Sequence, residues 1–131
     1  MERLFQALSD CTRLRLLNLV ARQEVCVCYF VEILGAPQPT ISRHLAYLRR
    51  AGLIKARREG KWMHYRINMP QNSLAKQVFS ETLRTLASDK QMQRDRAGLN
   101  RNCCAPGRPK RLRNAPIPTT LREPSGSRGL K

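Results

Sequence analysis

The amino-acid sequence predicts a mainly α-helical domain with one small β-hairpin, in the order α-α-α-α-β-β-α. The first observation behind this prediction is the spacing of Ile41, Leu45 and Leu48, which places three apolar side chains on one side of a helix. The second is the alternation of Met63 and Tyr65 with polar neighbours, which is typical of a strand. The third is the length, because 131 residues with 41% hydrophobic side chains suffice for one domain with a modest core.

Three helices are predicted in the N-terminal part of the chain. Their apolar residues recur at helical spacing, as Leu14 and Leu17 do in the second helix. Ser9 or Asp10 precedes that helix, and both residue types cap helix N-termini. Gly35 follows the third helix and suits a C-terminal cap. These helices span about residues 2–8, 11–22 and 26–34.

A tight turn at 35–38 leads into a fourth helix, at about 39–51. Pro39 suits the first position of this helix because its missing N–H would have no helical partner there. Gly52 suits the end of the helix. A hairpin follows, with strands at about 53–58 and 62–68 and a turn at 58–61.

The last predicted helix, at about 71–89, has an apolar stripe near heptad spacing. So small a domain offers little that could cover this stripe, and the helix therefore needs a partner. We expect it to pack against the first helix, within the chain and across the two-fold axis of a homodimer. The stripe consists of Leu74, Val78, Leu83 and Leu86.

The third helix, the turn and the fourth helix form the pattern of a helix-turn-helix, and the hairpin after them forms a wing. An α-helix fits the major groove of DNA, and basic wing residues can reach phosphates or the minor groove. The fourth helix taken alone could be an ordinary amphipathic surface helix, but the wing and the helix order favour DNA binding. The candidate DNA-binding residues are Gln38, Thr40, Ser42, Arg43 and His44 on the helix and Arg57, Arg58 and Lys61 on the wing.

The charge and the composition support a nucleic-acid partner. The chain has 25 Lys and Arg against nine Asp and Glu, a net charge of +16 that suggests a polyanionic partner, nucleic acid first and an anionic membrane second. No signal-peptide pattern or membrane-spanning run is present, so we expect a cytoplasmic protein with no membrane partner. We assign residues 1–90 to a DNA-binding and dimerisation domain. Residues 91–131 are basic, rich in proline and free of aromatic side chains, which predicts a disordered tail.

Several segments resemble the ArsR/SmtB family of winged helix-turn-helix repressors, and in particular its arsenite-sensing branch. The match runs in order through the chain, and it implies a homodimeric repressor that binds operator DNA and releases it when an inducer binds. The resemblance implies As(III) or Sb(III) as the inducer, and with it we expect no required cofactor and no enzymatic activity. The resembling segments are residues 7–17 (ALSDCTRLRLL), 24–28 (EVCVC), 38–45 (QPTISRHL), 48–54 (LRRAGLI) and 58–67 (REGKWMHYRI).

The sequence departs from the family pattern at two places. Cys11 stands where the family usually has proline. Val31 stands where the arsenite motif often has a third cysteine, and Tyr29 replaces its usual aspartate. The second departure leaves only two sulfur ligands in the third helix.

Cys26 and Cys28 are the first candidate inducer ligands. On an ideal helix their side chains would lie about 200° apart, so one ion could bind both only at a frayed helix start. We therefore hypothesise that a thiophilic ion unwinds the beginning of the third helix, displaces the fourth helix and lowers operator affinity. The alternative is that both cysteines are small apolar core residues.

Cys103 and Cys104 are the second candidate ligands. Adjacent thiols in a flexible tail can chelate without helical constraint, and nearby basic residues favour the thiolate. Some arsenic repressors of this family are similar in having tandem cysteines near the C-terminus. An incidental pair is the alternative reading. A third sulfur for As(III) could come from Cys11, although this residue reads more simply as a helix-start residue, from Cys26 or Cys28, or from the other subunit.

Two other functions compete with metalloid sensing. The same DNA-binding module could respond to thiol oxidation at either cysteine pair. A thiol enzyme or metallochaperone is a more remote alternative, because the chain has no Cys-x-x-Cys motif and no Gly-rich phosphate loop. The last helix contains no histidine and few acids, so we do not expect the zinc site that some relatives build there.

Overall fold

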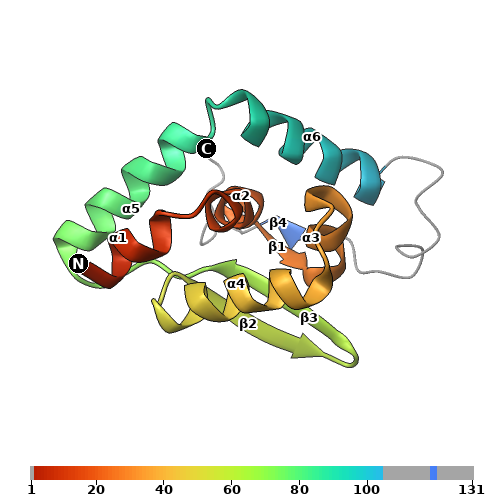
Figure 1. The fold of residues 1–131 in the computed structure, drawn as a ribbon, viewed down its shortest axis with the longest axis horizontal. Coiled ribbons are helices and arrows are strands. Elements are labelled where there is room, and N and C mark those ends of the chain that lie inside the picture. Colours follow the sequence, from red (N-terminus) through yellow and green to blue (C-terminus); the bar gives the residue numbers. More distant parts are fainter. Residues whose placement is uncertain (1, 105–118, 121–131) are drawn as a thin grey trace.

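The computed structural model describes residues 2–104 and 119–120, with side chains described for residues 2–101. Helices α1, α2 and α3 form the middle of the molecule, with α4 and the hairpin on one side and α5 and α6 on the other (Figure 1). The helices are α1 (Glu2–Leu8), α2 (Cys11–Val20), α3 (Val27–Leu34), α4 (Gln38–Arg50), α5 (Ser73–Leu86) and α6 (Lys90–Cys104). The strands are β1 (Gln23–Cys26), β2 (Ile54–Glu59), β3 (Trp62–Ile67) and β4 (Thr119–Thr120).

The local signals read from the sequence act as expected. The Asp10 carboxylate caps α2 by accepting a hydrogen bond from the Arg13 backbone N–H at 3.1 Å. Gly35 ends α3 with a φ of 69°, and Gly52 follows α4 with a φ of 80°, in the left-handed region that favours glycine. The predicted mainly α fold with a winged helix-turn-helix is confirmed, since each predicted element is present within a few residues of its expected bounds.

Strand β1 was not expected, and it turns the hairpin into a larger antiparallel sheet with strand order β2-β3-β1-β4. Val25 pairs with Tyr65 and Cys26 pairs with His64, so β1 lies directly beside the wing strand β3. β1 has only four residues, too few for a period of two to stand out in the sequence. This strand is what connects the cysteine segment to the wing.

The core lies between the sheet and the helices of the helix-turn-helix. Leu17 of α2, Phe30 of α3 and Leu48 of α4 have no exposed surface, and the Phe30 ring lies 6.1 Å from that of Tyr65 on β3. Helix α5 joins this core through Phe79, which is also fully buried. The recognition helix is therefore held by a continuous apolar core rather than by its own propensity.

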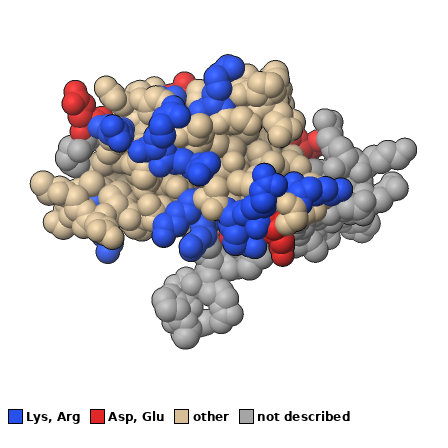
Figure 2. Space-filling view, turned by 90° about the horizontal axis from the view of Figure 1, so that it is seen from below, with Lys and Arg blue, Asp and Glu red and all other residues tan. Residues whose placement is uncertain are grey.

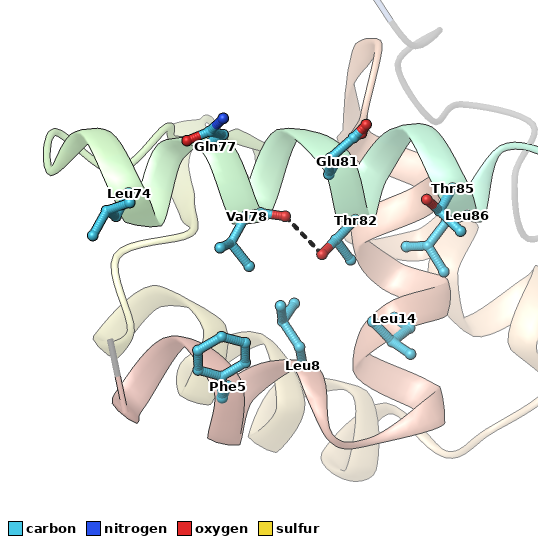
Figure 3. A pocket seen from close by; sticks show the side chains of 10 residues that line it. All are labelled: Phe5, Leu8, Leu14, Leu74, Gln77, Val78, Glu81, Thr82, Thr85 and Leu86. Carbon is cyan, nitrogen blue, oxygen red and sulfur yellow. Dashed lines mark hydrogen bonds between the residues drawn. The ribbon is translucent and has the colours of Figure 1, made fainter.

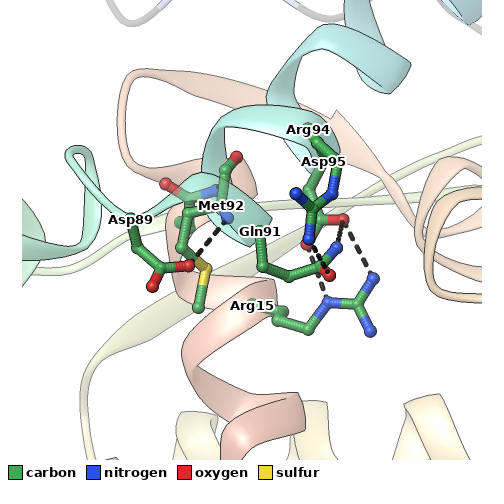
Figure 4. A network of polar contacts seen from close by, with 7 residues as sticks. Arg15, Asp89, Gln91, Met92, Arg94 and Asp95 are labelled. Carbon is green, nitrogen blue, oxygen red and sulfur yellow. Dashed lines mark hydrogen bonds and ion pairs between the residues drawn. The ribbon is translucent and has the colours of Figure 1, made fainter.

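Helix α6 corrects the predicted domain boundary. Residues 91–104 were expected to be disordered, but they form most of α6, and Met92 and Leu99 of this helix are buried. The sequence did not reveal the helix because part of its docking depends on a distant partner: Arg15 of α2 makes a bidentate ion pair with Asp95, at 2.7 and 2.9 Å (Figure 4). The rest of the predicted tail, apart from residues 119–120, lies outside the described residues.

A second set of hydrogen bonds supports the same junction. The Asn18 side-chain amide of α2 donates to the Met92 carbonyl at 3.0 Å. The Arg96 guanidinium donates to the Asn18 backbone carbonyl at 2.8 Å and to the Asn18 Oδ1 at 3.2 Å. Asn18 is 1% exposed, so these bonds satisfy a buried polar side chain. Helix α6 is thus attached to the scaffold of the helix-turn-helix by specific contacts.

We expect Asp95→Asn to lower the free energy of unfolding by about 2 kcal/mol, because Arg15 would keep its charge without a carboxylate partner. Arg15 is 23% exposed on its side chain, so the loss is below that of a fully buried pair. Urea unfolding measures the loss, and hydrogen exchange should show faster exchange in α6 first. Arg84→Gln is the control, since it breaks the exposed Glu81–Arg84 pair, and the loss of that pair should leave the unfolding midpoint unchanged. Equal protection of α6 in Asp95→Asn and the native protein would contradict the role of this ion pair.

Candidate DNA-binding face and thiol pair

The helix-turn-helix consists of α3, a short turn and α4. Ile41, Leu45 and Leu48 of α4 are 0–2% exposed and face the core, as their spacing predicted. The opposite side of α4 is open to solvent: Gln38, Ser42 and Arg43 are exposed, and Thr40 is partly exposed. An exposed polar face on a helix held by a rigid core is the geometry of a major-groove reader.

His44 of α4 contacts the N-terminal end of α2. Its Nδ1 atom lies 3.3 Å from Nη1 of Arg13 and 3.9 Å from Oδ1 of Asp10. Its side chain retains 20% exposure. His44 therefore links the recognition helix to α2 on one side and has a ring edge left for solvent or DNA on the other.

Three residues that sequence reasoning did not select extend this face. Tyr47 and Arg50 of α4 and Arg13 of α2 line a shallow hollow of about 360 Å³ together with Arg43, His44 and Ala46. The signal was present in the sequence, because positions 43, 46, 47 and 50 recur at helical spacing opposite the apolar stripe. The hollow continues the basic surface along the C-terminal half of α4.

The predicted basic wing residues differ in whether they already have an ion-pair partner within the chain. Arg57 of β2 makes a bidentate ion pair with Glu24 of β1, at 2.5 and 3.1 Å, and this bond lowers the pKa of Glu24. Arg58 and Lys61 are exposed, and Gly60 with a φ of 61° makes the turn between the strands. Arg57 thus already has a carboxylate partner. Arg58 and Lys61 have no ion pair among the described residues, and the Lys61 Nζ lies 5.2 Å from the centre of the Trp62 ring.

Figure 2 looks at the molecule from below the view of Figure 1, onto the side that carries α4 and the hairpin. Lys and Arg side chains form a broad band across this face, with few acidic side chains among them. The side of the molecule that carries α4 and the hairpin is therefore basic, which suits a DNA backbone.

Cys26 and Cys28 are brought together by the junction of β1 and α3. Cys26 is the last residue of β1 and caps α3 with an extended backbone (φ −74°, ψ 145°), and Cys28 lies in the first turn of the helix. Their sulfur atoms are 3.2 Å apart. The expected helical separation of about 200° does not apply, because only one of the two residues is helical. A thiophilic ion needs no frayed helix to reach both sulfurs.

The hydrogen bond between these thiols separates their pKa values. It lowers the pKa of Cys26 to about 7, because the Cys28 thiol donates to the Cys26 sulfur and stabilises its thiolate. The same bond and burial raise the pKa of Cys28. Cys26 is 1% exposed and Cys28 is partly exposed, so the pair is reached from the side of α3. The pair combines one thiolate near neutral pH with an adjacent thiol.

His64, a residue of the wing strand β3, lies beside Cys26. The two residues are directly paired between β3 and β1, and the His64 side chain is only 6% exposed. Its Nε2 atom lies 3.0 Å from Oε1 of Glu59 without the geometry of a hydrogen bond. The burial follows from the pairing with β1, which the sequence did not reveal.

Of the other cysteines, only Cys11 has a described side chain. Cys11 is exposed at the start of α2. Cys103 and Cys104 are the last residues of α6, and their side chains lie outside the described residues. Among the residues whose side chains are described, no group of three or more His, Cys, Asp or Glu has the arrangement of a metal site.

An apolar groove lies on the other side of the molecule, between α1 and α5 (Figure 3). It has a volume of about 590 Å³, and Phe5 and Leu74 at its rim are 52% and 62% exposed. Val78 and Leu86 of α5 point into it from the predicted stripe, whereas the buried side of α5 is formed by Ala75 and Phe79. No helix within the described residues is long and apolar enough to cross a membrane.

The sequence is similar to a family of bacterial regulatory proteins. Residues 10–56 match the model of the bacterial regulatory protein arsR family. The chain is 43% identical over 82 residues to the arsenical resistance operon repressor of Escherichia coli, covering 62% of this chain and 70% of that protein. It is 49% identical over 65 residues to the arsenic resistance transcriptional regulator ArsR1 of Pseudomonas putida, covering 49% of this chain and 51% of that protein, so it spans about half the length of ArsR1.

A solved structure shares the fold. HlyU from Vibrio cholerae superposes with a TM-score of 0.54 at 28% identity, covering 64% of this chain and 88% of that chain. The family model and the sequence relatives thus agree on one family of transcriptional regulators, and the structural neighbour shares the fold.

Proposed function

This chain belongs to the ArsR family and is a DNA-binding transcriptional repressor, and from that premise we propose that it binds operator DNA as a homodimer and releases it when As(III) or Sb(III) binds cysteine thiolates. The family consists of transcriptional regulators rather than enzymes. The observation that carries the inducer part of the proposal is the 3.2 Å separation of the Cys26 and Cys28 sulfurs at the start of the helix-turn-helix.

The groove between α1 and α5 supports the homodimer. A soluble domain rarely exposes side chains such as Phe5 and Leu74 together unless a partner covers them. A two-fold axis through this face would bury the same groove in both copies. It would also carry the two α4 helices toward successive major grooves, about 34 Å apart.

The donor chemistry supports a thiophilic inducer. Thiolates prefer soft ions over the oxygen-loving Mg²⁺ and Ca²⁺. An ion held about 2.3 Å from each sulfur, as zinc is, can bridge sulfurs separated by up to about 4.6 Å, and the Cys26–Cys28 separation lies within that limit. Cys103 and Cys104 are the proposed source of further sulfur, since they end α6, which packs against α3.

The position of the thiol pair supports its coupling to DNA. Cys26 ends β1, which pairs with the wing strand β3, while Cys28 lies in the first turn of α3, which packs against the recognition helix α4. An ion on both sulfurs would fix the angle between strand and helix, and so the position of the wing relative to α4. Release requires only that the inducer bind the DNA-free arrangement more tightly, by about 1–3 kcal/mol.

A second candidate function is thiol-redox repression through the same pair. Sulfurs already in contact, one with a pKa of about 7, can be oxidised together. A peroxide would take two electrons and two protons from the dithiol, leaving a disulfide and water. The fold and the DNA-binding face would be the same in both cases.

We expect arsenite to release the native protein from fluorescently labelled operator DNA, measured by anisotropy under anaerobic conditions with a non-thiol reductant. Antimonite should act alike, and Mg²⁺ or Ca²⁺ should have no effect. The thiol pair predicts this result because only a thiophilic ligand can engage it. If arsenite leaves the complex intact while peroxide dissociates it reversibly, the redox function replaces the metalloid function.

A further inference from the structure

A basic hollow lies beside the recognition helix, between α4 and the N-terminal end of α2. It is lined by Arg13, Arg43, His44, Ala46, Tyr47 and Arg50. We propose that this hollow binds one phosphate of the operator backbone, that Arg43, His44 and Arg50 donate to it, and that Arg13 positions His44. The inference rests on the DNA binding of the proposed function and assigns its backbone contact.

The lining of the hollow consists mainly of side chains that can donate hydrogen bonds, and it contains no carboxylate. Within the described residues, the side chains of Arg43 and Arg50 have no hydrogen-bond or ion-pair partner, so both guanidinium groups are available. Ala46 leaves the floor of the hollow open, and the Tyr47 hydroxyl can donate at its side. Two available guanidinium groups beside one hollow favour an anion that can accept from both, such as a phosphodiester.

Arg13 has a different task from the other two arginines. Its Nε donates to the Ala7 carbonyl at 2.9 Å, and its Nη2 donates to the Gln6 carbonyl at 3.0 Å. Its guanidinium carbon lies 4.1 Å from the centre of the Tyr47 ring. With these contacts made, Arg13 holds α1, α2 and α4 together and is a positioning residue rather than a phosphate ligand.

The contact between Arg13 and His44 determines which His44 nitrogen can donate. Arginine has donors only, so at 3.3 Å from Arg13 Nη1 the Nδ1 atom of His44 must accept. A neutral imidazole then has its proton on Nε2, at the ring edge away from α2. Asp10, whose Oδ1 lies 3.9 Å from the same Nδ1, is the other charged group on this edge, and Arg43 lines the hollow beside the ring. His44 therefore presents an N–H donor to the hollow.

The position of the hollow along α4 favours backbone over base contact. Recognition helices meet base edges mainly with their N-terminal residues, here Gln38, Thr40 and Ser42. Arg50 ends the helix, and it also lines a second hollow of about 320 Å³ with Arg3 and Gln6 of α1. The basic surface therefore extends from the end of α4 toward α1. A DNA backbone strand could follow this direction.

The test combines protein variants with single uncharged phosphates. Arg50→Gln should weaken operator binding about tenfold, equally for operators with altered bases, and should reduce the slope of log affinity against log salt by about 1 per half-site. Lys76→Gln, which removes an exposed cation on α5, should change neither. A methylphosphonate, which has no charge, is then placed in turn at each backbone position of the operator. It should weaken operator binding by the native protein at several positions, and at one of these positions it should not weaken binding by Arg50→Gln any further.

His44 variants test the donor. In His44→Gln the amide nitrogen can occupy the Nε2 position, so affinity should stay near the native value, whereas His44→Asn should lose affinity and share the insensitive position with Arg50→Gln. The phosphate assignment would be overturned if the affinity loss of a variant and the loss from the methylphosphonate simply added at every backbone position. It would also be overturned if the affinity loss of a variant were confined to operators with particular base pairs. Failure of the native protein to bind any operator would instead overturn the proposed function.

Discussion

Cys26→Ser/Cys28→Ser is expected to bind operator DNA as tightly as the native protein and to remain bound when arsenite is added. The thiol pair lies at the β1–α3 junction, away from the exposed side of α4, so its sulfur chemistry is not needed for DNA contact. Serine hydroxyls are poor ligands for soft ions, so the inducer loses its site. Anisotropy titration of the preformed complex with arsenite measures the effect.

The matched variant is Cys103→Ser/Cys104→Ser, which removes the other thiol pair. If α6 supplies only additional sulfur, this variant should still be released, at a higher arsenite concentration. Cys11→Ser should behave as the native protein, because Cys11 is exposed at the start of α2. Because Cys26 is 1% exposed and its loss could disturb the core, Cys28→Ser alone serves as the milder variant and should also resist arsenite. Release of both Cys28→Ser and the double serine variant at the native arsenite concentration would exclude this pair as the inducer site.

Leu74→Glu is expected to convert the protein to a monomer and to weaken operator binding about 100-fold or more. The side chain is 62% exposed at the rim of the α1–α5 groove, so the substitution should change the free energy of unfolding by no more than about 0.5 kcal/mol. In a dimer, however, it would bury a carboxylate at the apolar interface. A monomer contacts one half-site and loses the gain from linking two.

Ser80→Glu is the matched control, since it adds the same charge at an exposed position of α5 that does not line the groove. Sedimentation velocity gives the oligomeric state, and anisotropy gives the affinity. A dimeric Leu74→Glu with native affinity would show that the two copies, if they associate, do so through another surface.

The elements that the sequence predicted well are those whose signals are local. Asp10 caps α2, Gly35 and Gly52 end two helices, and the apolar stripe of α4 faces the core as its spacing required. Each of these signals depends on a few neighbouring residues and on backbone preferences that hold in any fold. The resembling segments, among them residues 24–28 and 58–67, added the family to a helix-turn-helix and wing already indicated by the order of the elements.

The elements that the sequence missed depend on distant partners. β1 is a strand because it pairs with β3, and its four residues have no period of their own. α6 is docked because Asp95 meets Arg15, 80 residues earlier, and neither side chain predicts the other from its own neighbours. His64 is buried because Cys26 of β1 pairs with it across the sheet.

For the candidate sites, the sequence by itself determined which residues carry the chemistry: two thiols with one residue between them, a recognition helix and a basic hairpin. Tertiary structure decided how they are used. It set Cys26 at a strand end and Cys28 in a helix so that their sulfurs meet at 3.2 Å, and it turned His44 toward Arg13. The physical reason is that residue type and periodicity are properties of a short segment, whereas the distance between two side chains is fixed by packing of the whole core.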